Sequence, residues 1–470
     1  MIFSSLLFIF IFLPVTLLIY YISPWKIKNF VLLIMSLIFY AWGEPVYIFL
    51  MMFSIVFNYF SARQMGVHRQ LRQQHHLKIC FVVTVAVNLA ILGFFKYYGF
   101  LIQNINGIFG SSIKAAQIAL PIGISFYTFQ TLSYIIDVYW GNVKVQKNII
   151  DFGAYITMFP QLIAGPIVRY KDIAAQLKHR TITFAGVSDG VSWFIRGLGK
   201  KVLLANNIGM LYDTVFAIAA SDRAALTTWL GIIAYTFQIY FDFSGYSDMA
   251  IGLGKMLGFE FVKNFDYPYI SGSATEFWRR WHISLSTWFR EYVYIPMGGN
   301  RVAAPRHILN ILVVWLLTGL WHGASWAFVL WGLFWAVLLL LEKYIYGRFL
   351  ERLPAAIRHI YTIFAFIFGW LIFTSSSVAG FGSNLSSMFG GLGNAFADAG
   401  TGYFFRTNLI LLLICGFCST PVVWKVFRKS ARSGQLLPRV ITALCYLVIF
   451  AASVASLVNA SYNPFLYFRF

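Results

Sequence analysis

The chain has 470 residues, of which 59% are hydrophobic and only 11% are charged, whereas soluble domains carry about 25% charged residues. These proportions exclude an ordinary soluble domain and indicate a membrane protein that crosses the bilayer many times. The net charge of +20 does not indicate a nucleic-acid partner, because the basic residues form short clusters between apolar runs, as membrane orientation requires. A cytoplasmic cluster would also attract an anionic lipid or a polyphosphorylated substrate.

Five apolar runs in the first third of the chain predict membrane spans. They are residues 2–22, 30–42, 46–60, 79–100 and 118–140. A Gly-Glu-Pro turn joins the second run to the third, as a hairpin or as one broken helix. The first run lacks a basic leader and a small-residue cleavage site, so we expect a retained span. The basic segment 63–78 is predicted to be a cytoplasmic loop.

Two middle segments differ from ordinary spans. Residues 155–168 are interrupted by Pro160, Gly165 and Pro166, which predicts a re-entrant element whose backbone is covered by protein or by a water-filled cavity. Residues 184–219 predict a more polar helix along the cytoplasmic interface. Residues 381–403, rich in Gly, Ser and Asn, predict an exposed outer loop.

Further apolar runs bring the expected total to about eleven spans. These later runs are residues 227–240, 308–341, 361–374, 404–426 and 440–458. The sequence therefore predicts an all-α polytopic membrane protein with re-entrant and interfacial helices, organised as a single domain over residues 1–470.

His322 is the only ionisable side chain between residues 308 and 341. This stretch is too long for one ordinary span, since about 20 residues cross a bilayer. Gly319 and Gly323 flank the histidine and weaken a helix there. We predict a break between two membrane segments near His322, with the ring facing protein or water. An ionisable group inside a membrane is costly, so His322 is a candidate functional residue.

Residues 277–295 are predicted to form one amphipathic helix. At about 100° per residue, an apolar face rich in tryptophan lies opposite a face with Arg279, His282 and Arg290. Such a helix suits a membrane interface, where the arginines would meet lipid phosphates. The alternative is that Arg279, Arg280 and Arg290 line the mouth of a cavity into which His282 points. The pattern favours the first interpretation and leaves the second open.

Asp242 and Asp248 lie among apolar neighbours, and a carboxylate at membrane depth needs a partner. One interpretation pairs either aspartate with an arginine of residues 277–295 as a structural strut, which is the commoner role. The other has one aspartate orient a catalytic histidine by binding its second ring nitrogen.

The sequence predicts no metal site. Cys415 and Cys418 have the CxxC spacing, but no second pair or nearby histidine completes a ligand set, and we expect buried structural cysteines. His282 and His322 alone do not fill a typical zinc shell of three or four protein ligands.

Six segments together resemble the membrane-bound O-acyltransferase superfamily, in particular its bacterial polysaccharide-modifying branch of the alginate O-acetylation type. The segments are LPIGISFYTFQTLSYIIDVYWG, FPQLIAGPIVRYKD, QIYFDFSGYSDMAIGLGKMLGF, EFWRRWHISLSTWFREYVYIPMGGNR, LTGLWHGASWAFVLWG and NPFLYFRF. The similarity covers essentially the whole chain. The combination is specific, whereas a single fragment such as WHG would be weak.

The resemblance implies a ring of spanning helices around a thin core, with funnels from both sides that meet near a histidine. By the same resemblance, His322 matches the invariant active-site histidine, and His282 matches a second hallmark position. The implied reaction moves an acyl group from a cytoplasmic thioester, acetyl-coenzyme A or a carrier-protein thioester, across a bacterial inner membrane. An extracytoplasmic hydrolase-like partner would then complete transfer to a polysaccharide acceptor.

These residue types fit the implied chemistry. Burial disfavours the charged imidazolium, so we expect a neutral His322 that deprotonates the acceptor hydroxyl, with a histidine nucleophile as an open alternative. His282 would position the donor or stabilise developing negative charge. Arg279, Arg280 and Arg290 would hold the donor's phosphates. No permanently bound cofactor is expected.

Two other functions fit parts of the pattern. A transporter would also carry buried histidines and broken helices. A related acyltransferase could move D-alanine to teichoic acid, or an acyl group to a lipid or protein. The sequence does not select the acceptor polymer.

Overall fold

The computed structural model describes residues 1–431, 435–459, 462–464 and 466, and every regular element in these ranges is a helix. The predicted all-α class is therefore confirmed. The chain divides into two compact units: unit 1 comprises residues 1–194 and 249–262, and unit 2 comprises residues 195–248 and 263–470. That residues 1–470 act as a single domain stays a prediction.

Within the described residues, six helical stretches are long and apolar enough to cross a membrane. They are α4 (Gln74–Phe109), α14 (Ala304–His322), the stretch Trp326–Arg352 that begins with α15 (Trp326–Leu341), α17 (Ala355–Thr374), α19 (Ala399–Cys418) and α21 (Leu436–Asn459). Only 6% of the apolar window of α19 and 11% of that of α21 is buried, as expected for helices that face lipid tails. The protein is a multi-pass membrane protein, and the total of about eleven spans stays a prediction.

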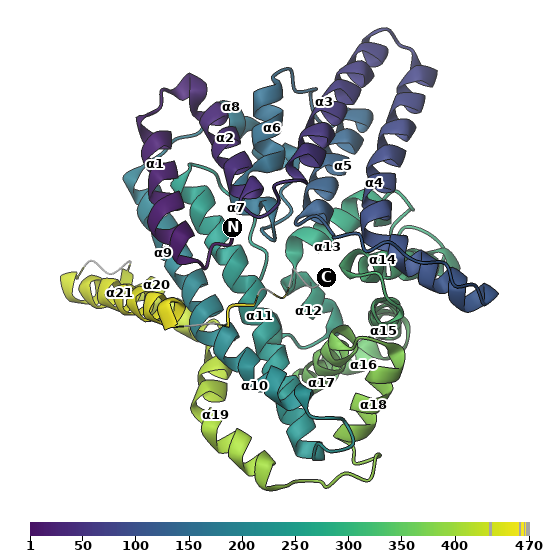
Figure 1. Ribbon diagram of the computed structural model, residues 1–470, viewed down its shortest axis with the longest axis vertical. Helices are drawn as coiled ribbons and strands as arrows, with labels where there is room; N and C mark the ends of the chain where they lie inside the picture. Colours follow the sequence, from purple (N-terminus) through teal and green to yellow (C-terminus); the bar gives the residue numbers. More distant parts are fainter. Residues whose placement is uncertain (432–434, 460–461, 465, 467–470) are drawn as a thin grey trace. The chain divides into compact units, whose positions relative to one another are not determined.

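Unit 1 begins with several short helices and a long pair. The first elements are η1 (Phe8–Phe12), α1 (Leu13–Ile22), η2 (Trp25–Ile27), α2 (Lys28–Ala41) and α3 (Ile48–Gln70). Figure 1 shows α3 and α4 side by side, and Asn58 of α3 exchanges hydrogen bonds of 3.1 and 2.7 Å with Asn88 of α4. The predicted turn between α2 and α3 is confirmed.

The predicted loop over residues 63–78 is wrong. Helix α3 runs on to Gln70 and α4 begins at Gln74, so only three residues separate the two helices. Gln, Arg, Leu and Lys dominate this segment and are good helix formers, so its polarity did not imply an irregular backbone.

The remaining helices of unit 1 include the broken segment that the sequence predicts. They are α5 (Ile124–Trp140), α6 (Ile149–Thr157), α7 (Phe159–Leu162) and α8 (Tyr170–Lys178). The chain breaks between α6 and α7 at Met158, and residues 152–168 are all buried. This burial fits backbone that is covered by protein. The re-entrant placement in a membrane stays a prediction.

The helix predicted over residues 184–219 is also present. It consists of α9 (Phe184–Gly199), the π-turn η3 (Lys200–Ala205) and α10 (Asn206–Ala217), and α11 (Ala225–Met256) follows it.

The other elements of unit 2 are η4 (Pro268–Ile270), α12 (Ala274–Arg280), α13 (Ile283–Phe289), η5 (Arg290–Tyr294), η6 (Glu342–Tyr346), α16 (Gly347–Arg352), α18 (Val378–Met388) and α20 (Val422–Ala431).

The predicted exposed loop over residues 381–403 is wrong at both ends, and only residues 389–398 lie between helices. Helix α18 extends to Met388, and its N-terminus is capped by the Ser377 side chain, which accepts a hydrogen bond from the Gly380 amide. Helix α19 begins at Ala399 behind a capping box made by Asp398 and Thr401. Small polar residues that suggest a loop are also the preferred helix caps, which explains the difference.

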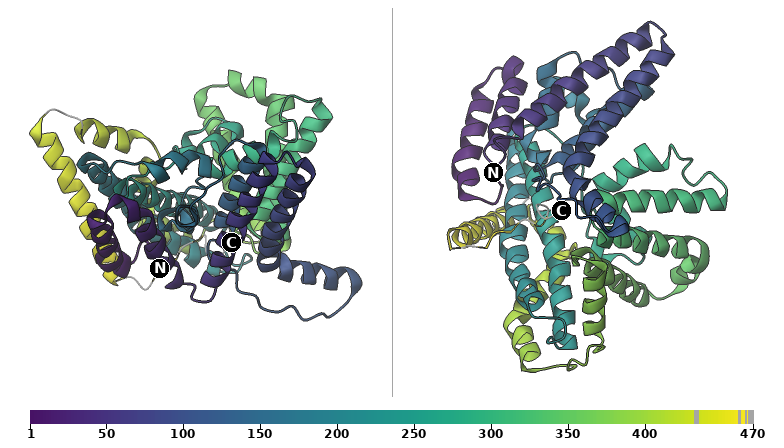
Figure 2. Two further views of the ribbon diagram at one scale, coloured as in Figure 1. Left: turned by 90° about the horizontal axis from the view of Figure 1, so that it is seen from above. Right: turned by 45° about the vertical axis from the view of Figure 1, so that its right-hand side comes forward.

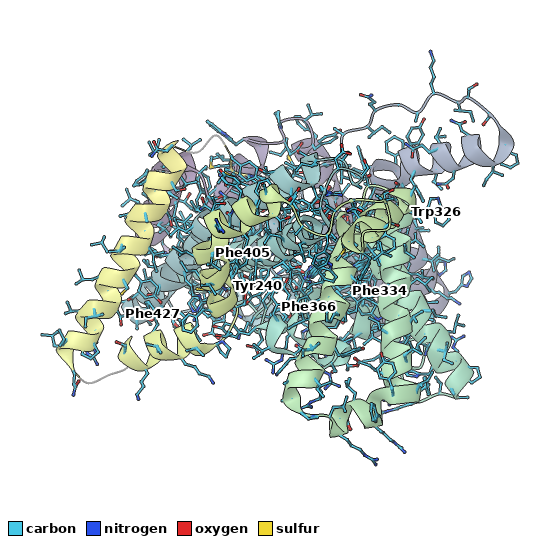
Figure 3. All side chains as sticks on the ribbon, turned by 90° about the horizontal axis from the view of Figure 1, so that it is seen from below. Tyr240, Trp326, Phe334, Phe366, Phe405 and Phe427 are labelled. Atoms are coloured by element: carbon cyan, nitrogen blue, oxygen red, sulfur yellow. The ribbon has the colours of Figure 1, made fainter. Side chains whose placement is uncertain are left out.

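Aromatic side chains fill the core of unit 2. The ring of Phe277 stacks on Trp335 at 5.4 Å between centroids, and Tyr269 links Tyr240 to Phe366 at 5.1 and 4.4 Å. Figure 3 shows Tyr240 and Phe366 within this mass of side chains, while Trp326, which is 58% exposed, lies at its border. Such pairs add to the stability that burial alone provides.

The predicted break near His322 is confirmed. Helix α14 ends at His322 and α15 begins at Trp326, capped by the Ser325 side chain, so the two helices form a tight hairpin. The right-hand view of Figure 2 shows the helices of this region in green. The hairpin needs glycine at its crossing, because a Cβ on Gly319 would lie 2.2 Å from the Phe328 carbonyl oxygen and one on Gly332 2.4 Å from that of Trp315.

We predict that Gly319→Ala forces α14 and α15 apart and lowers the free energy of unfolding by about 1–3 kcal/mol, the usual cost of overpacking. Thermal unfolding of the purified protein in detergent measures the loss. Gly416→Ala in α19 is the matched control, because no atom lies within 4 Å of its added Cβ, and it should cause no loss. Equal stability of the two variants would contradict the close crossing.

Candidate active site

His322 lies at the last position of α14, against an aromatic wall. Its ring is 5.0 Å from Trp321, 5.1 Å from Trp331 and 5.2 Å from Phe373, between centroids, and meets each nearly edge-on. The side chain is 5% exposed. The helix end and these three rings together fix the direction of the imidazole.

His282 lies in a sharp bend and not in the single helix that the sequence predicts. Helix α12 ends at Arg280 and α13 begins at Ile283, and between them His282 adopts the left-handed conformation with φ 44° and ψ 53°. The predicted continuous helix over residues 277–295 is therefore wrong. A left-handed residue cannot continue an α-helix, and the bend turns His282 inward, where it is 1% exposed.

Asn264 holds the bend from outside the two helices. Its backbone carbonyl oxygen accepts a 2.9 Å hydrogen bond from the Ile283 amide, and its side-chain Oδ1 accepts a 3.1 Å bond from the Ser284 amide. The first amides of a helix have no partner within the helix, so these bonds compensate for the interruption.

The two histidines meet at one tryptophan. The indole of Trp321 lies 5.9 Å from the ring of His282 and 5.0 Å from that of His322, between centroids. Residues that are 40 positions apart in the sequence therefore contact the same side chain. Burial lowers the pKa of His282 to about 3, so its ring is neutral at physiological pH.

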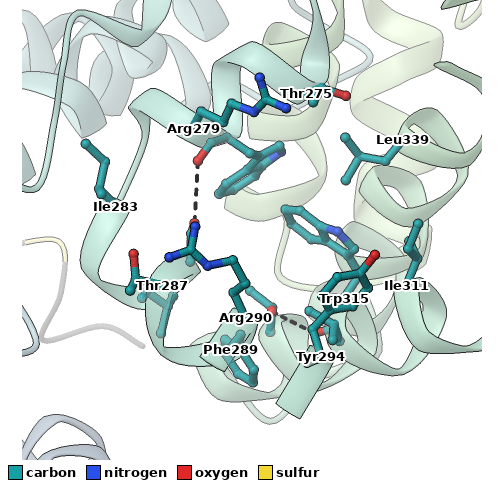
Figure 4. A pocket seen from close by; sticks show the side chains of 15 residues that line it. Thr275, Arg279, Ile283, Thr287, Phe289, Arg290, Tyr294, Ile311, Trp315 and Leu339 are labelled. Carbon is teal, nitrogen blue, oxygen red and sulfur yellow. Dashed lines mark hydrogen bonds between the residues drawn. The ribbon is translucent and has the colours of Figure 1, made fainter. Parts of the chain in front are cut away.

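A pocket of about 470 Å³ lies beside this pair (Figure 4). Trp278, Trp315 and Leu339 contribute to its apolar walls, and Arg279 and Arg290 bring positive charge to it. Both arginines are exposed, and Arg290 also lies 3.6 Å from the carboxylate of Glu291. The volume lies within the range of about 300–1,000 Å³ that small-molecule pockets occupy.

The pocket is lined by residues of both histidine-bearing segments. Thr318 of α14 lines it and precedes His322 by four residues, which is about 6 Å along a helix. Ile283, the residue after His282, also lines it. Neither imidazole is among the lining side chains, so the pocket reaches the two segments and not the rings themselves.

Arg280 does not lie with the other two arginines. It forms ion pairs with Glu276 at 2.9 Å and Asp266 at 3.7 Å, and it does not line the pocket. The structure therefore brings Arg279 and Arg290 to one pocket and directs Arg280 elsewhere, because successive residues of a helix point about 100° apart.

Both predicted aspartates act as struts, with other partners than the sequence suggests. Asp242 pairs with Lys201 at 2.5 Å, and Asp248 pairs with Arg196 at 3.1 Å and Lys200 at 2.8 Å. The pairing with an arginine of residues 277–295 is wrong, because the cations come from α9 and η3.

Asp242 also holds the end of the described chain. Its Oδ2 accepts a 2.9 Å hydrogen bond from the Leu466 amide, while Lys201 donates to the Pro464 carbonyl oxygen. Of the terminal motif that carries part of the resemblance, Phe465 and residues 467–470 lie outside the described residues.

The cysteines and the carboxylates form no metal centre within the ranges that the structure describes. No group of three or more His, Cys, Asp and Glu side chains there is arranged to hold a metal ion. Cys415 is buried and Cys418 partly so.

The chain matches the model of one protein family. The family model described as MBOAT, membrane-bound O-acyltransferase family, matches residues 143–384, which include both histidines. The chain belongs to the membrane-bound O-acyltransferase family. The family assignment that the sequence motifs suggest is thus confirmed.

Three relatives within this family differ in how much of the chain they match. A probable alginate O-acetylase AlgI from Azotobacter vinelandii is 39% identical over 506 residues, with 100% of both chains covered. A peptidoglycan O-acetyltransferase from Helicobacter pylori is 34% identical over 80% of this chain and 78% of its own. A teichoic acid D-alanyltransferase from Streptococcus thermophilus is 32% identical over 45% of this chain and 54% of its own. The predicted enzyme class, an O-acetyltransferase of this family, is confirmed.

Two residues that support the candidate site were not predicted from the sequence. Asn264 is completely buried, but nothing in its sequence context marks it as a neighbour of His282. Glu342 accepts hydrogen bonds from the Ala274 amide at 2.6 Å, the Thr275 amide at 2.9 Å and the Tyr361 hydroxyl at 3.0 Å, so it anchors the start of α12. A carboxylate at the end of a long apolar run was the available signal.

We predict that Asp242→Asn lowers the free energy of unfolding by about 3–5 kcal/mol, because Lys201 is then a buried charge without its counter-ion. Denaturation in detergent measures the change. Adding Lys201→Met should restore part of the loss, since the second substitution removes the unpaired charge. A double variant that is less stable than Asp242→Asn would contradict the strut.

Proposed function

We propose that the protein transfers an acetyl group from a cytoplasmic thioester to a cell-envelope polysaccharide outside the bacterial inner membrane, with His322 as general base. One observation carries the proposal: two buried histidines meet at Trp321 beside a pocket that carries two arginines. Full-length similarity to a probable alginate O-acetylase supports acetyl as the group and a polysaccharide as the acceptor class.

The chemistry needs one proton acceptor at the reacting hydroxyl. His322 takes the hydroxyl proton, the oxygen attacks the thioester carbonyl carbon, and the carbon–sulfur bond breaks to release a thiolate. The ester is the product, and the proton on His322 is then available to the thiolate. Imidazole suits this role because its usual pKa lies near physiological pH.

The pocket is the site that we assign to the donor. Acetyl-coenzyme A and a carrier-protein thioester share a narrow pantetheine arm, built of short aliphatic segments joined by two amide groups, with phosphate at its end. The tryptophan walls suit the arm, and Arg279 and Arg290 suit the phosphates. In this assignment the donor is a substrate, and the enzyme needs no resident cofactor.

A second protein completes the reaction in this proposal. The hydroxyl that attacks the thioester belongs to an extracytoplasmic hydrolase-like acetyltransferase, which receives the acetyl group in this step and then passes it to the polymer that it binds. Alginate and peptidoglycan are both candidates as acceptors, because the relatives are named for each. Mass spectrometry of cell-envelope polymers from a deletion strain shows which polymer loses acetyl esters. A loss of D-alanyl esters would instead indicate transfer of D-alanine to teichoic acid.

We predict that His322→Gln lowers acetyl transfer by about 10²–10⁴-fold, the usual contribution of a general base, while the protein still folds. Acetyl esters released from the polymer of a complemented deletion strain measure the activity, and thermal unfolding in detergent checks the fold. A folded variant with unimpaired acetylation would refute the role of His322.

We also predict that Arg279→Gln and Arg290→Gln each raise the KM for the donor by about 10-fold or more, as expected for a lost hydrogen bond between charged groups. The dependence of KM on salt should weaken in both variants, because screening then acts on fewer charges. Arg301→Gln is the matched control, since Arg301 is exposed and does not line the pocket. An equal effect of all three substitutions would place the donor elsewhere.

A further inference from the structure

The side-chain oxygen of Asn264 has three polar neighbours, one of which is His282. Oδ1 of Asn264 lies 3.1 Å from the Ser284 amide nitrogen, 2.9 Å from Ser284 Oγ and 3.2 Å from His282 Nδ1. Asn264 is completely buried, and His282 is 1% exposed, so these bonds form in a medium of low polarity. A hydrogen bond in such surroundings is costly to lose.

The Ser284 amide decides which atom of the Asn264 side chain faces His282. An amide oxygen and nitrogen are difficult to tell apart by position alone. A backbone N–H can only donate, so the atom 3.1 Å from it is the oxygen. The same oxygen faces Nδ1 of His282. Because an amide oxygen can only accept, Nδ1 carries a proton and donates it to Asn264.

A neutral imidazole holds a single proton, and here Asn264 assigns it to Nδ1. The low pKa of His282 keeps the ring neutral above about pH 3. Nε2 therefore has no hydrogen and presents a lone pair. Edge-on packing against Phe243, with 4.7 Å between centroids, leaves the ring little freedom to turn over.

We propose that Asn264 is a positioning residue that fixes His282 as the Nδ1–H tautomer, so that Nε2 of His282 accepts a hydrogen bond from an O–H or N–H of the bound reactant. The proposal rests on the proposed function only in placing His282 at the reacting groups. It assigns His282 a different role from the stabilisation of negative charge expected from the sequence, because a nitrogen without hydrogen cannot donate to an oxyanion.

The alternative is that Asn264 only caps α13. Its backbone oxygen already accepts from the Ile283 amide at 2.9 Å, and its Oδ1 from the Ser284 amide, and both bonds would serve a cap. A cap does not depend on the tautomer of His282. The state of the ring nitrogens therefore separates the two roles.

The experiment measures the protonation of the ring nitrogens by ¹⁵N NMR. The full-length protein is labelled with ¹⁵N-histidine and reconstituted in lipid, and the His282→Asn spectrum is subtracted to assign the His282 signals. We expect a protonated Nδ1 and an unprotonated Nε2 in the wild type. A wild-type ring with its proton on Nε2 overturns the proposal, whatever the activity of the enzyme.

Three variants complete the test. Asn264→Ala removes the acceptor, so the Nε2–H tautomer should appear, and kcat should fall by about 10- to 100-fold, as for other residues that orient a functional histidine. Asn264→Asp keeps an acceptor oxygen in nearly the same volume and should keep the proton on Nδ1, while its negative charge favours a second proton on Nε2. Ser284→Ala removes a bond from the same oxygen and should leave the tautomer unchanged. An unchanged tautomer in Asn264→Ala overturns the proposal.

The ¹⁵N spectrum tests the positioning role of Asn264, and acetyl transfer tests the proposed function, so the two can fail separately. If Asn264→Ala fails to fold, the wild-type spectrum and that of Asn264→Asp still decide the tautomer. A protonated Nδ1 in a protein that transfers no acetyl group would overturn the proposed function and support the positioning role. A proton on Nε2 of His282 in a protein that does transfer acetyl groups would support the proposed function and overturn the positioning role of Asn264.

Discussion

The candidate active site depends on the left-handed turn at His282. A regular helix would place this histidine on the polar face with Arg279 and Arg290 and direct it toward a membrane surface. The turn instead moves it into the aromatic core, to the tryptophan that also contacts His322. A non-glycine residue with positive φ costs of order 1–3 kcal/mol and persists only where its surroundings determine it. Asn264 supplies that determination through the backbone and the side chain.

The second constraint is the hairpin of α14 and α15. Glycine at positions 319 and 332 lets the two backbones approach to distances that no side chain would allow. Small residues at helix crossings are typical of membrane proteins, where close packing replaces the hydrophobic effect as a source of stability. The crossing lies one turn before His322, so it fixes the height and direction of the imidazole within the core.

The sequence predicted what depends on local chemistry and missed what depends on contact at a distance. The break at His322 was predictable, because glycines interrupt an apolar run that is too long for one span. The bend at His282 was not, since the helical periodicity of residues 277–295 persists across it and its cause is Asn264, 18 residues away. The same limit applies to Asp242 and Asp248, whose need for partners was clear while the choice of Lys201, Arg196 and Lys200 was set by the fold.

Glu342 connects the two histidine-bearing segments at their far ends. It belongs to the stretch that follows His322, and its carboxylate holds the first amides of the helix that precedes His282. The two segments are therefore in contact at two places. At one end Glu342, which follows α15, binds the start of α12, and at the other end the indole of Trp321 contacts both imidazole rings. Because both segments are held in this way, the separation between the two rings is set by the scaffold around them.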